Sequence, residues 1–328
     1  MPFSDIIGHS RQVEILRRGL ERGRLPHAYL FLGPQGIGKR TVALSLAMAI
    51  HCGDGPHDFC GRCRSCLSIH VGNHPDVHPV GPLAGKKEIA IQQIRELERV
   101  LAFRPFSGKK KVALIDPADV MNYHAQNSLL KTLEEPPGDS LLILLAGSTG
   151  GLLPTLLSRC QRLSFSPLSQ GLVAEELVRR RGVSREQARV LASLTMGSLG
   201  EALTCDVEEY LAQRRQWIER LSSLAPKDYR GMMALAEEQA GDREQALKFL
   251  QWIEGWYRDI LRYQVTEKTE ELRHADLAER VRQQAMLYSI DQVLGILAQI
   301  VRAIGEIHRN YNRRLTLEKF LMKAVFSS

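Results

Sequence analysis

The sequence predicts an α/β domain followed by purely helical domains, and three observations support this division. Over the first 166 residues, short apolar runs alternate with amphipathic stretches of helical periodicity. A glycine-rich segment, "GPQGIGKRT" at 33–41, lies between an apolar run and a helical stretch. From about residue 170 to the C-terminus only the helical periodicity continues. Short buried strands that alternate with helices are typical of an α/β domain with a mostly parallel sheet.

The individual elements of the α/β domain follow from these runs. The predicted strands are short and apolar, at 28–33, 111–116, 141–147 and 162–166. The predicted helices are amphipathic stretches, at 10–22, 39–51, 89–103 and 122–135. In such stretches apolar residues three or four positions apart share one face of the helix.

The domain boundaries follow from a change in composition. We interpret "SFSPLSQ" (164–170) as a linker, because a different, helical pattern begins after it. We therefore expect three domains: an α/β domain at 1–166, a small helical domain at 167–206 and an all-α domain at 207–328.

The overall composition is that of a globular protein, with 44% hydrophobic and 25% charged residues. Forty-four Lys and Arg against 37 Asp and Glu give a net charge of +7, which fits contact with nucleic acid or an acidic partner. No apolar run approaches the roughly 20 residues that span a bilayer, and no signal-peptide pattern opens the chain. We therefore expect a cytoplasmic protein without membrane contact, in which clustered cysteines bind metal more often than they form disulfides.

The segment "GPQGIGKRT" has the pattern of a loop that binds nucleotide phosphates. In a strand–loop–helix setting, backbone N–H groups and a lysine turn toward the phosphates. The residues that such a site would use are Gly33, Gly36, Gly38 and Lys39. The next position normally carries a Ser or Thr hydroxyl that binds Mg²⁺, and Arg40 stands there instead. Thr41 is no simple substitute, because one helical step rotates a side chain by ~100°.

A second motif of nucleotide-hydrolysing proteins is also incomplete. "KVALIDPAD" places Asp116 at the end of an apolar strand, where a metal-binding aspartate is expected. A glutamate that orients the attacking water normally follows, and Pro117 stands in its place. We therefore expect a residual site for ATP or ADP, formed by the loop with Thr41 and Asp116, that does not hydrolyse nucleotide. Two points stay open: whether nucleotide binds there, and whether Asp116 only caps the strand.

Four of the six cysteines form a cluster in "CGDGPHDFCGRCRSC". Two C-x-x-C steps with one cysteine upstream can surround a single ion, and four thiolates are a ligand set that structural Zn²⁺ prefers. The predicted zinc ligands are Cys52, Cys60, Cys63 and Cys66. A redox pair is the alternative reading, and three histidines could replace individual ligands: His51, His57 and His70.

Further motifs give the α/β part a family resemblance. They are "HPDVHPV" (74–80), "NSLLKTLEEPP" (127–137) and "LLPTLLSRCQRLSFSPL" (152–168). Together with the phosphate loop and the cysteine cluster, they resemble the clamp-loader branch of the AAA+ family. The resemblance covers residues 1 to about 205 with specific motifs, and beyond them only length and helical character agree.

The resemblance implies how such a chain would act. Clamp-loader subunits form a pentameric spiral in which ATP lies between neighbours, with a small helical lid domain and a C-terminal collar that holds the subunits together. Arg159 matches the arginine of the family's S-R-C motif, which reaches the γ-phosphate on the adjacent subunit; pairing with a local carboxylate is the alternative. In "GSLGEAL" (197–203) Gly200 replaces an arginine with which motor subunits touch their own nucleotide.

The altered positions all belong to the chain's own nucleotide site, whereas Arg159 would act on a neighbour and is intact. The resemblance therefore implies a non-hydrolysing subunit of the bacterial DNA polymerase III clamp loader, which stimulates ATP hydrolysis on a neighbouring subunit during DNA replication. The implied partners are motor subunits of gamma/tau type and a clamp-opening subunit of delta type, with the sliding clamp and primer-template DNA reached through the complex. Two alternatives stay open: an active motor-type ATPase and a zinc-dependent DNA-binding protein.

Overall fold

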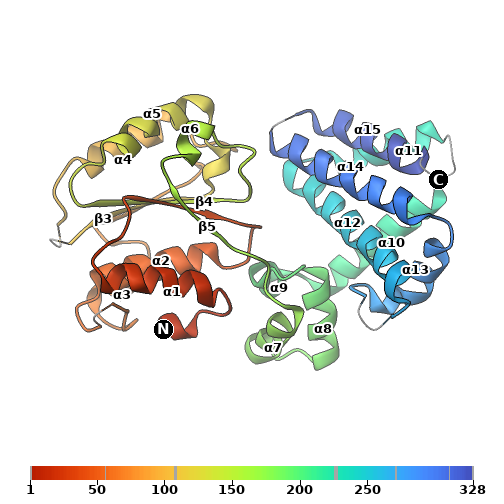
Figure 1. Cartoon of the computed structure of the whole chain (residues 1–328), viewed down its shortest axis with the longest axis horizontal. Coiled ribbons are helices and arrows are strands. Elements are labelled where there is room, and N and C mark those ends of the chain that lie inside the picture. Colours follow the sequence, from red (N-terminus) through yellow and green to blue (C-terminus); the bar gives the residue numbers. More distant parts are fainter. Residues whose placement is uncertain are drawn as a thin grey trace. The chain divides into compact units, whose positions relative to one another are not determined.

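The structure is a computed structural model that describes residues 2–55, 57–106, 109–224, 228–269, 272–309 and 311–326. The chain divides into two compact units, Met1–Leu203 and Thr204–Ser328. Among the described residues every strand belongs to the first unit, and the second unit is helical (Figure 1). The predicted change from an α/β part to an all-α part is therefore confirmed.

A parallel sheet of five strands forms the centre of the first unit. Its strands are β1 (Ala28–Leu32), β2 (Val77–Val80), β3 (Lys111–Ile115), β4 (Ser140–Ala146) and β5 (Gln161–Ser164). They lie side by side in the order β2-β3-β4-β1-β5, and every neighbouring pair is parallel. In this register Leu30 of β1 lies opposite Leu144 of β4 and Arg162 of β5. All residues of β3 and β4 are buried, as is usual where helices cover both faces of a parallel sheet.

Helices cover the two faces of this sheet (Figure 1). One face carries α1 (Ser10–Glu21), α2 (Lys39–His51) and α3 (Arg64–His70), and the other carries α4 (Ile91–Leu101), α5 (Tyr123–Glu134) and α6 (Pro154–Leu157). Two 3₁₀ turns accompany them, η1 (Phe3–Asp5) and η2 (Ala118–Val120). Because side chains alternate along a strand, Tyr29 and Phe31 pack with residues of α2, whereas Leu30 packs with residues of α5. The apolar runs of β1, β3 and β4 therefore contribute to both cores.

The predicted strands and helices of this unit are confirmed, with bounds that agree to within two residues. The sequence prediction missed β2, which consists of "VHPV" and lies at the edge of the sheet. A proline is tolerated on an edge strand, although it lacks the N–H of the ladder. The two valines of β2 are separated by His78 and Pro79, so no apolar run stands out. The prediction also missed α3, a short helix inside the cysteine-rich segment.

Three short helices follow the sheet: α7 (Gln170–Arg181), α8 (Arg185–Leu194) and α9 (Leu199–Thr204). Ser169 caps α7 by accepting the N–H of Leu172, and Ser184 forms a capping box with Gln187 at the start of α8. Gly182 ends α7 with φ 65°, a left-handed conformation that glycine adopts without strain. These helices are the ones expected after the linker; their status as a separate lid domain stays a prediction.

The second unit consists of long helices around one core. Its helices are α10 (Val207–Ser223), α11 (Tyr229–Gln239), α12 (Arg243–Thr266), α13 (Ala278–Ala285), α14 (Ile290–His308) and α15 (Arg313–Phe326), with the 3₁₀ turn η3 (Ala275–Leu277). Trp217, Trp252 and Trp256 lie in this core, and the last two stack with ring centroids 6.0 Å apart. They stand four positions apart on α12, where helical geometry makes such side chains neighbours.

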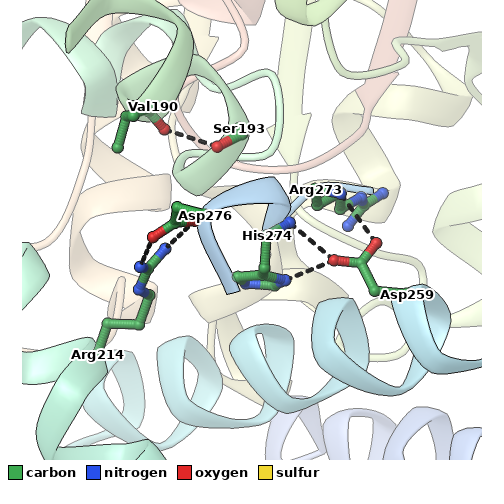
Figure 2. A network of polar contacts seen from close by, with 7 residues as sticks. All are labelled: Val190, Ser193, Arg214, Asp259, Arg273, His274 and Asp276. Atoms are coloured by element: carbon green, nitrogen blue, oxygen red, sulfur yellow. Dashed lines mark hydrogen bonds and ion pairs between the residues drawn. The ribbon is translucent and has the colours of Figure 1, made fainter. Parts of the chain in front are cut away.

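A buried polar network holds the segment before α13 against α12 (Figure 2). Oδ1 of Asp259 accepts the backbone N–H of Arg273 at 2.9 Å. Its Oδ2 accepts the backbone N–H of His274 at 2.8 Å and lies 2.7 Å from Nδ1 of the same residue. Two positions further on, Asp276 forms an ion pair with the buried Arg214. Since Asp259 and His274 are almost wholly buried, these bonds satisfy polar groups that water does not reach.

No single helix among the described residues is long and apolar enough to cross a membrane. The segments Ala278–Ala285 and Ile290–His308 pass that test only as a pair, which bends by 112°. Both contribute residues to the core of the second unit, Val281 and Ile296 among them.

Candidate functional site

The phosphate loop lies where it was predicted, between β1 and α2. Two of its glycines have surroundings that leave no room for a side chain. A Cβ atom on Gly33 would lie 2.3 Å from the carbonyl oxygen of Phe165, and one on Gly36 would lie 2.1 Å from Oγ of Ser198. Their φ angles, 153° and 74°, also favour glycine. The loop is therefore packed closely against the segment after β5 and against the segment that begins α9.

Lys39 turns back onto the loop itself. Its ammonium donates to the carbonyl oxygens of Gly33 and Pro34, each at 2.6 Å. Burial lowers the pKa of Lys39, while the nearby carboxylates of Asp116 and Asp119 raise it. Two of the three donors of the ammonium are thus used by the loop's own backbone.

Arg40 contacts the aspartate that the sequence assigns to a metal. Its Nη1 lies 2.9 Å from Oδ2 of Asp116, which follows β3. Thr41, the remaining hydroxyl of the motif, is exposed on the first turn of α2. The structure therefore brings two of the predicted site residues, Lys39 and Asp116, close to each other, with Arg40 bound to the aspartate. It also shows a contact that the sequence did not predict, in which a guanidinium is bound to the carboxylate expected to hold Mg²⁺.

Two other segments form hydrogen bonds with the loop. Nε2 of His9 lies 2.7 Å from the carbonyl oxygen of Ile37, and the N–H of Gly200 donates to the carbonyl oxygen of Gly36 at 2.9 Å. A Cβ atom on Gly200 would lie 3.0 Å from that same oxygen. The backbone of Gly36 thus lies where the side chain of the arginine expected from the resemblance would begin. Sequence reasoning missed His9, because a histidine just before a helix carries no signal of its own.

These contacts decide how well the residues fit a magnesium-bound triphosphate. Mg²⁺ requires oxygen ligands in nearly octahedral geometry. The position after Lys39 offers a cation instead of a hydroxyl, and Pro117 offers no carboxylate next to Asp116. The residues present therefore do not fit the metal, although the glycines and the lysine of a phosphate loop are retained.

The four predicted metal ligands lie together. One Sγ atom from each of the four cysteines lies within 4.8 Å of the others: Cys52, Cys60, Cys63 and Cys66. The backbone N–H of Cys60 donates to Sγ of Cys52 at 3.4 Å, and that of Cys63 donates to Sγ of Cys60 at 3.2 Å. Backbone bonds to sulfur orient the ligands of a metal site. The donor set fits a structural zinc ion, for which four thiolates are a common shell.

The surroundings of these cysteines suit a closed site. Cys52 and Cys66 are buried and share a small core with Phe3 and Phe59. Burial raises the pKa of Cys66 to about 12. Burial acts on Cys63 in the same direction, but hydrogen bonds within the cluster outweigh it and lower the pKa to about 7. The ligands thus differ in their surroundings while their sulfur atoms converge on one point.

A second buried group joins "HPDVHPV" to the last residue of α2. Ligand-type atoms of His51, His74 and Asp76 lie within 4.8 Å of one another. Nδ1 of His74 accepts the backbone N–H of Asp76 at 3.2 Å, and Oδ1 of Asp76 accepts the backbone N–H of Phe106 at 2.7 Å. Burial lowers the pKa of His51 to about 4, so this histidine is neutral. These bonds tie the segment before β2 to the segment before β3, which gives the motif a structural function.

Arg159 lies on the surface between α6 and β5. Its Nη2 lies 2.6 Å from Oε1 of Glu134, the last residue of α5, and its Nη1 donates to the carbonyl oxygen of Thr155 at 2.9 Å. The arginine side chain is 35% exposed and the glutamate side chain 51%. The local carboxylate that the sequence left open as an alternative partner is therefore present. The Arg159 side chain is thus paired and still partly exposed.

Comparison with known proteins assigns a family to the chain. The family "DNA polymerase III, delta subunit" matches residues 8–169, and "DNA polymerase III, delta subunit, C terminal" matches residues 208–324. The DNA polymerase III subunit delta' of Bacillus subtilis is 32% identical over 95% of this chain and 94% of its own. The same subunit of Pseudomonas aeruginosa is 32% identical over 92% of both chains. The subunit tau of Escherichia coli is 34% identical over 62% of this chain and 32% of its own length.

A phosphate loop on a parallel sheet, with Gly200 of the short helix α9 bound to the loop, defines an α/β domain of the AAA+ class, followed here by a helical C-terminal part. The chain belongs to the family of DNA polymerase III delta' subunits. The family similarity also extends over the helical part, where the sequence motifs carried no information.

Proposed function

We propose that this chain is the delta'-type subunit of a bacterial DNA polymerase III clamp loader, working in the cytoplasm, and that it does not hydrolyse ATP itself. It supplies Arg159 to the ATP of a neighbouring motor subunit while the sliding clamp is loaded onto primer-template DNA. Two delta' relatives that match almost the whole chain support its place in the loader. The similarity to a tau subunit supports a common design with the motor subunits.

The contact between Arg40 and Asp116 carries the non-hydrolysing part of the proposal. In a hydrolysing site of this kind, the hydroxyl after the lysine and an aspartate hold Mg²⁺ between them. Here the first position contributes a guanidinium, which binds the remaining carboxylate at 2.9 Å. A positive charge therefore lies beside the carboxylate that would bind the metal. Pro117 adds a second loss, because its ring cannot orient an attacking water.

Binding of ATP or ADP without hydrolysis would require Lys39 to change partners. Its ammonium would have to leave the carbonyl oxygens of Gly33 and Pro34 to reach a phosphate. Gly36 is at the same time bound by Gly200 of α9. We therefore assign the loop a mainly structural role, which is to join β1, α2 and α9.

Arg159 would act on a triphosphate that this chain does not bind. An arginine supplied to a neighbouring site stabilises charge in the transition state and is typically worth about 10³- to 10⁵-fold in turnover. Its place just before β5 and its partial exposure support this role, because the guanidinium can be reached by another subunit.

The cysteine cluster would hold a structural zinc ion. The ion would supply a cross-link between the end of α2 and the start of α3, because Cys52 follows the first helix and Cys66 lies in the second. All four ligands would be thiolates, which leaves no open position for a substrate.

The second unit would pack in the collar of a hetero-pentamer with gamma/tau-type and delta-type subunits. Five large apolar side chains between α13 and α14 and along α14 are exposed: Met286, Leu287, Ile290, Leu294 and Val301. Ile290, Leu294 and Val301 follow one another at helical spacing, so they form one stripe. Apolar stripes of this kind suit contact with a second helix rather than with water.

Two measurements test the proposed function. The purified chain should not turn over ATP, and Lys39→Ala should make no difference to that rate. A loader that contains the Arg159→Ala chain should assemble with normal affinity, yet turn over ATP and load clamps more slowly in the presence of clamp and primed DNA. Lysine-dependent hydrolysis by the purified chain would support a motor-type ATPase instead. Normal clamp loading with Arg159→Ala would refute the role of this arginine.

A further inference from the structure

The guanidinium of Arg159 is held in one orientation before any neighbour is bound. Glu134 contacts Nη2 at 2.6 Å, and the carbonyl oxygen of Thr155 accepts from Nη1 at 2.9 Å. Oγ of Ser158 lies 3.4 Å from the same Nη1. The two stronger contacts come from different elements, since Glu134 ends α5 and Thr155 lies in α6.

The two elements that carry these contacts are fixed relative to each other. The buried side chain of Gln126 in α5 accepts the backbone N–H of Leu153 at 2.8 Å and donates to the carbonyl oxygen of Gly151 at 2.8 Å. Both polar atoms of its amide therefore bind the segment that leads into α6. Leu129 of α5 and Leu156 of α6 are fully buried in one core. The carboxylate and the carbonyl that hold Arg159 thus stand on rigid supports.

A guanidinium held in this way is prepared for a second ligand. It has five N–H donors in one rigid plane, and a contact on each Nη determines how that plane is oriented. An arginine that is free in solution loses rotamer freedom when it binds, and this loss weakens the interaction. Holding the plane in advance removes part of that loss, and groups oriented before the reaction are the ones that stabilise developing charge best.

We propose that Glu134 is a positioning residue for Arg159, which presents the guanidinium to the phosphates of a nucleotide bound by a neighbouring subunit. This assignment rests on the proposed function of Arg159. The pair is partly exposed, so the guanidinium can add a phosphate as a further partner while Glu134 keeps its contact. Glu134 acts through the arginine and does not itself meet the phosphates, whose charge has the same sign.

The chain offers a matched control for this role. Glu135 is the next residue, is exposed, and carries the same charge in the same segment. If the carboxylates served only the local charge balance, Glu134→Ala and Glu135→Ala would have equal effects. If Glu134 positions Arg159, only its replacement slows the neighbour's chemistry.

The experiment uses loaders assembled with Glu134→Ala, Glu134→Gln, Glu135→Ala and unchanged chains. The rate constant kcat and the KM for ATP are measured with clamp and primed DNA present. We expect Glu134→Ala to lower kcat by about 10- to 100-fold, because misplacing a reacting group by about 1 Å can cost about 10²-fold. KM should stay unchanged. Glu134→Gln should lie between the two, because its amide oxygen still accepts a hydrogen bond, and Glu135→Ala should match the unchanged chain.

A double substitution separates positioning from any other effect. Because Glu134 acts through Arg159, adding Glu134→Ala to Arg159→Ala should cause no further loss of kcat. A further loss of the same size would overturn the positioning role, as would a normal kcat with Glu134→Ala alone. A normal kcat with Arg159→Ala would instead overturn the proposed function of the arginine.

Folding and assembly are controlled in the same loaders. The melting temperature of each chain and its affinity for the other subunits should match those of Glu135→Ala. Should Glu134→Ala fail to fold, the comparison of Glu134→Gln with Glu135→Gln decides the question, because both changes keep the shape of the side chain. Equal kcat values for that pair would refute the positioning role.

Discussion

Replacing Arg40 by threonine would restore the hydroxyl that a magnesium-binding phosphate loop carries after its lysine. The change also removes the guanidinium from Asp116 and leaves that carboxylate available to a metal. We expect the Arg40→Thr chain to bind ATP in a magnesium-dependent manner, which the unchanged chain does not do. Hydrolysis should remain absent, because Pro117 still supplies no group that orients water.

The size of the gain follows from the charges at the site. The guanidinium lies 2.9 Å from Oδ2 of Asp116. Mg²⁺ bound to that oxygen at about 2.1 Å would be roughly 4 Å from the guanidinium nitrogen. The Arg40 side chain is 57% exposed, so the value for water applies, and charges of +1 and +2 repel by about 2 kcal/mol at that distance. This energy corresponds to roughly 30-fold in the affinity for the metal. Loss of the exposed ion pair should change the free energy of unfolding by no more than about 1 kcal/mol.

Equilibrium titration with a fluorescent ATP analogue, with and without Mg²⁺, measures this gain. Arg40→Ala serves as the control, because it removes the charge and adds no hydroxyl. The magnesium-dependent affinity should be lowest for the unchanged chain, higher for Arg40→Ala and highest for Arg40→Thr. Adding Asp116→Asn should abolish the gain. If Mg²⁺ strengthens binding equally in the unchanged and Arg40→Thr chains, Arg40 does not occupy the metal's place and the reasoning is wrong.

Two further expectations concern the metal and the core of the second unit. Metal analysis should find one zinc per chain; Cys63→Ser should abolish this binding and Cys205→Ser should retain it. If the ion is present at 1,000 times its Kd, its removal should lower the free energy of unfolding by about 4 kcal/mol. An unchanged melting temperature after chelation would contradict this. Asp259→Ala leaves the backbone N–H groups of Arg273 and His274 without their acceptor. Two buried donors without a partner cost about 2–6 kcal/mol together, so chemical denaturation should show a loss of that size, against little change for the exposed control Asp291→Ala. A loss below 1 kcal/mol would show that water replaces the carboxylate.

Much of the fold could be predicted from the sequence because it depends on short-range patterns. The apolar runs of β1, β3 and β4 are almost wholly buried, so each stands out as a continuous stretch. In β5, an edge strand, only Leu163 is buried, and the apolar residues around it marked the strand. The edge strand β2 did not stand out, because His78 and Pro79 separate its two valines. An edge strand tolerates a proline, since one of its sides has no partner strand. In the second unit helical periodicity predicted the helices, but no local pattern indicated that Asp259 would fix the distant His274.

The candidate sites, too, were predictable from the sequence only where they depend on short-range patterns. The phosphate loop and the cysteine cluster each lie within one short segment, so residue types and spacing sufficed to predict them. The family motifs likewise identified Arg159. None of these patterns showed which side chains would bind the guanidinium groups of Arg40 and Arg159.

By itself, then, the sequence determined the α/β and helical parts, the phosphate loop, the four thiols and the arginine expected to act on a neighbour. Only the tertiary structure decided that Arg40 meets Asp116 across 76 positions of chain, that Gly200 binds the loop at Gly36, and that Glu134 holds Arg159. The physical reason is that such contacts depend on strand order and on how helices pack over the sheet. A strand order in which β4 lies between β3 and β1 is set by long-range packing of many side chains together, and no local run of residues encodes it.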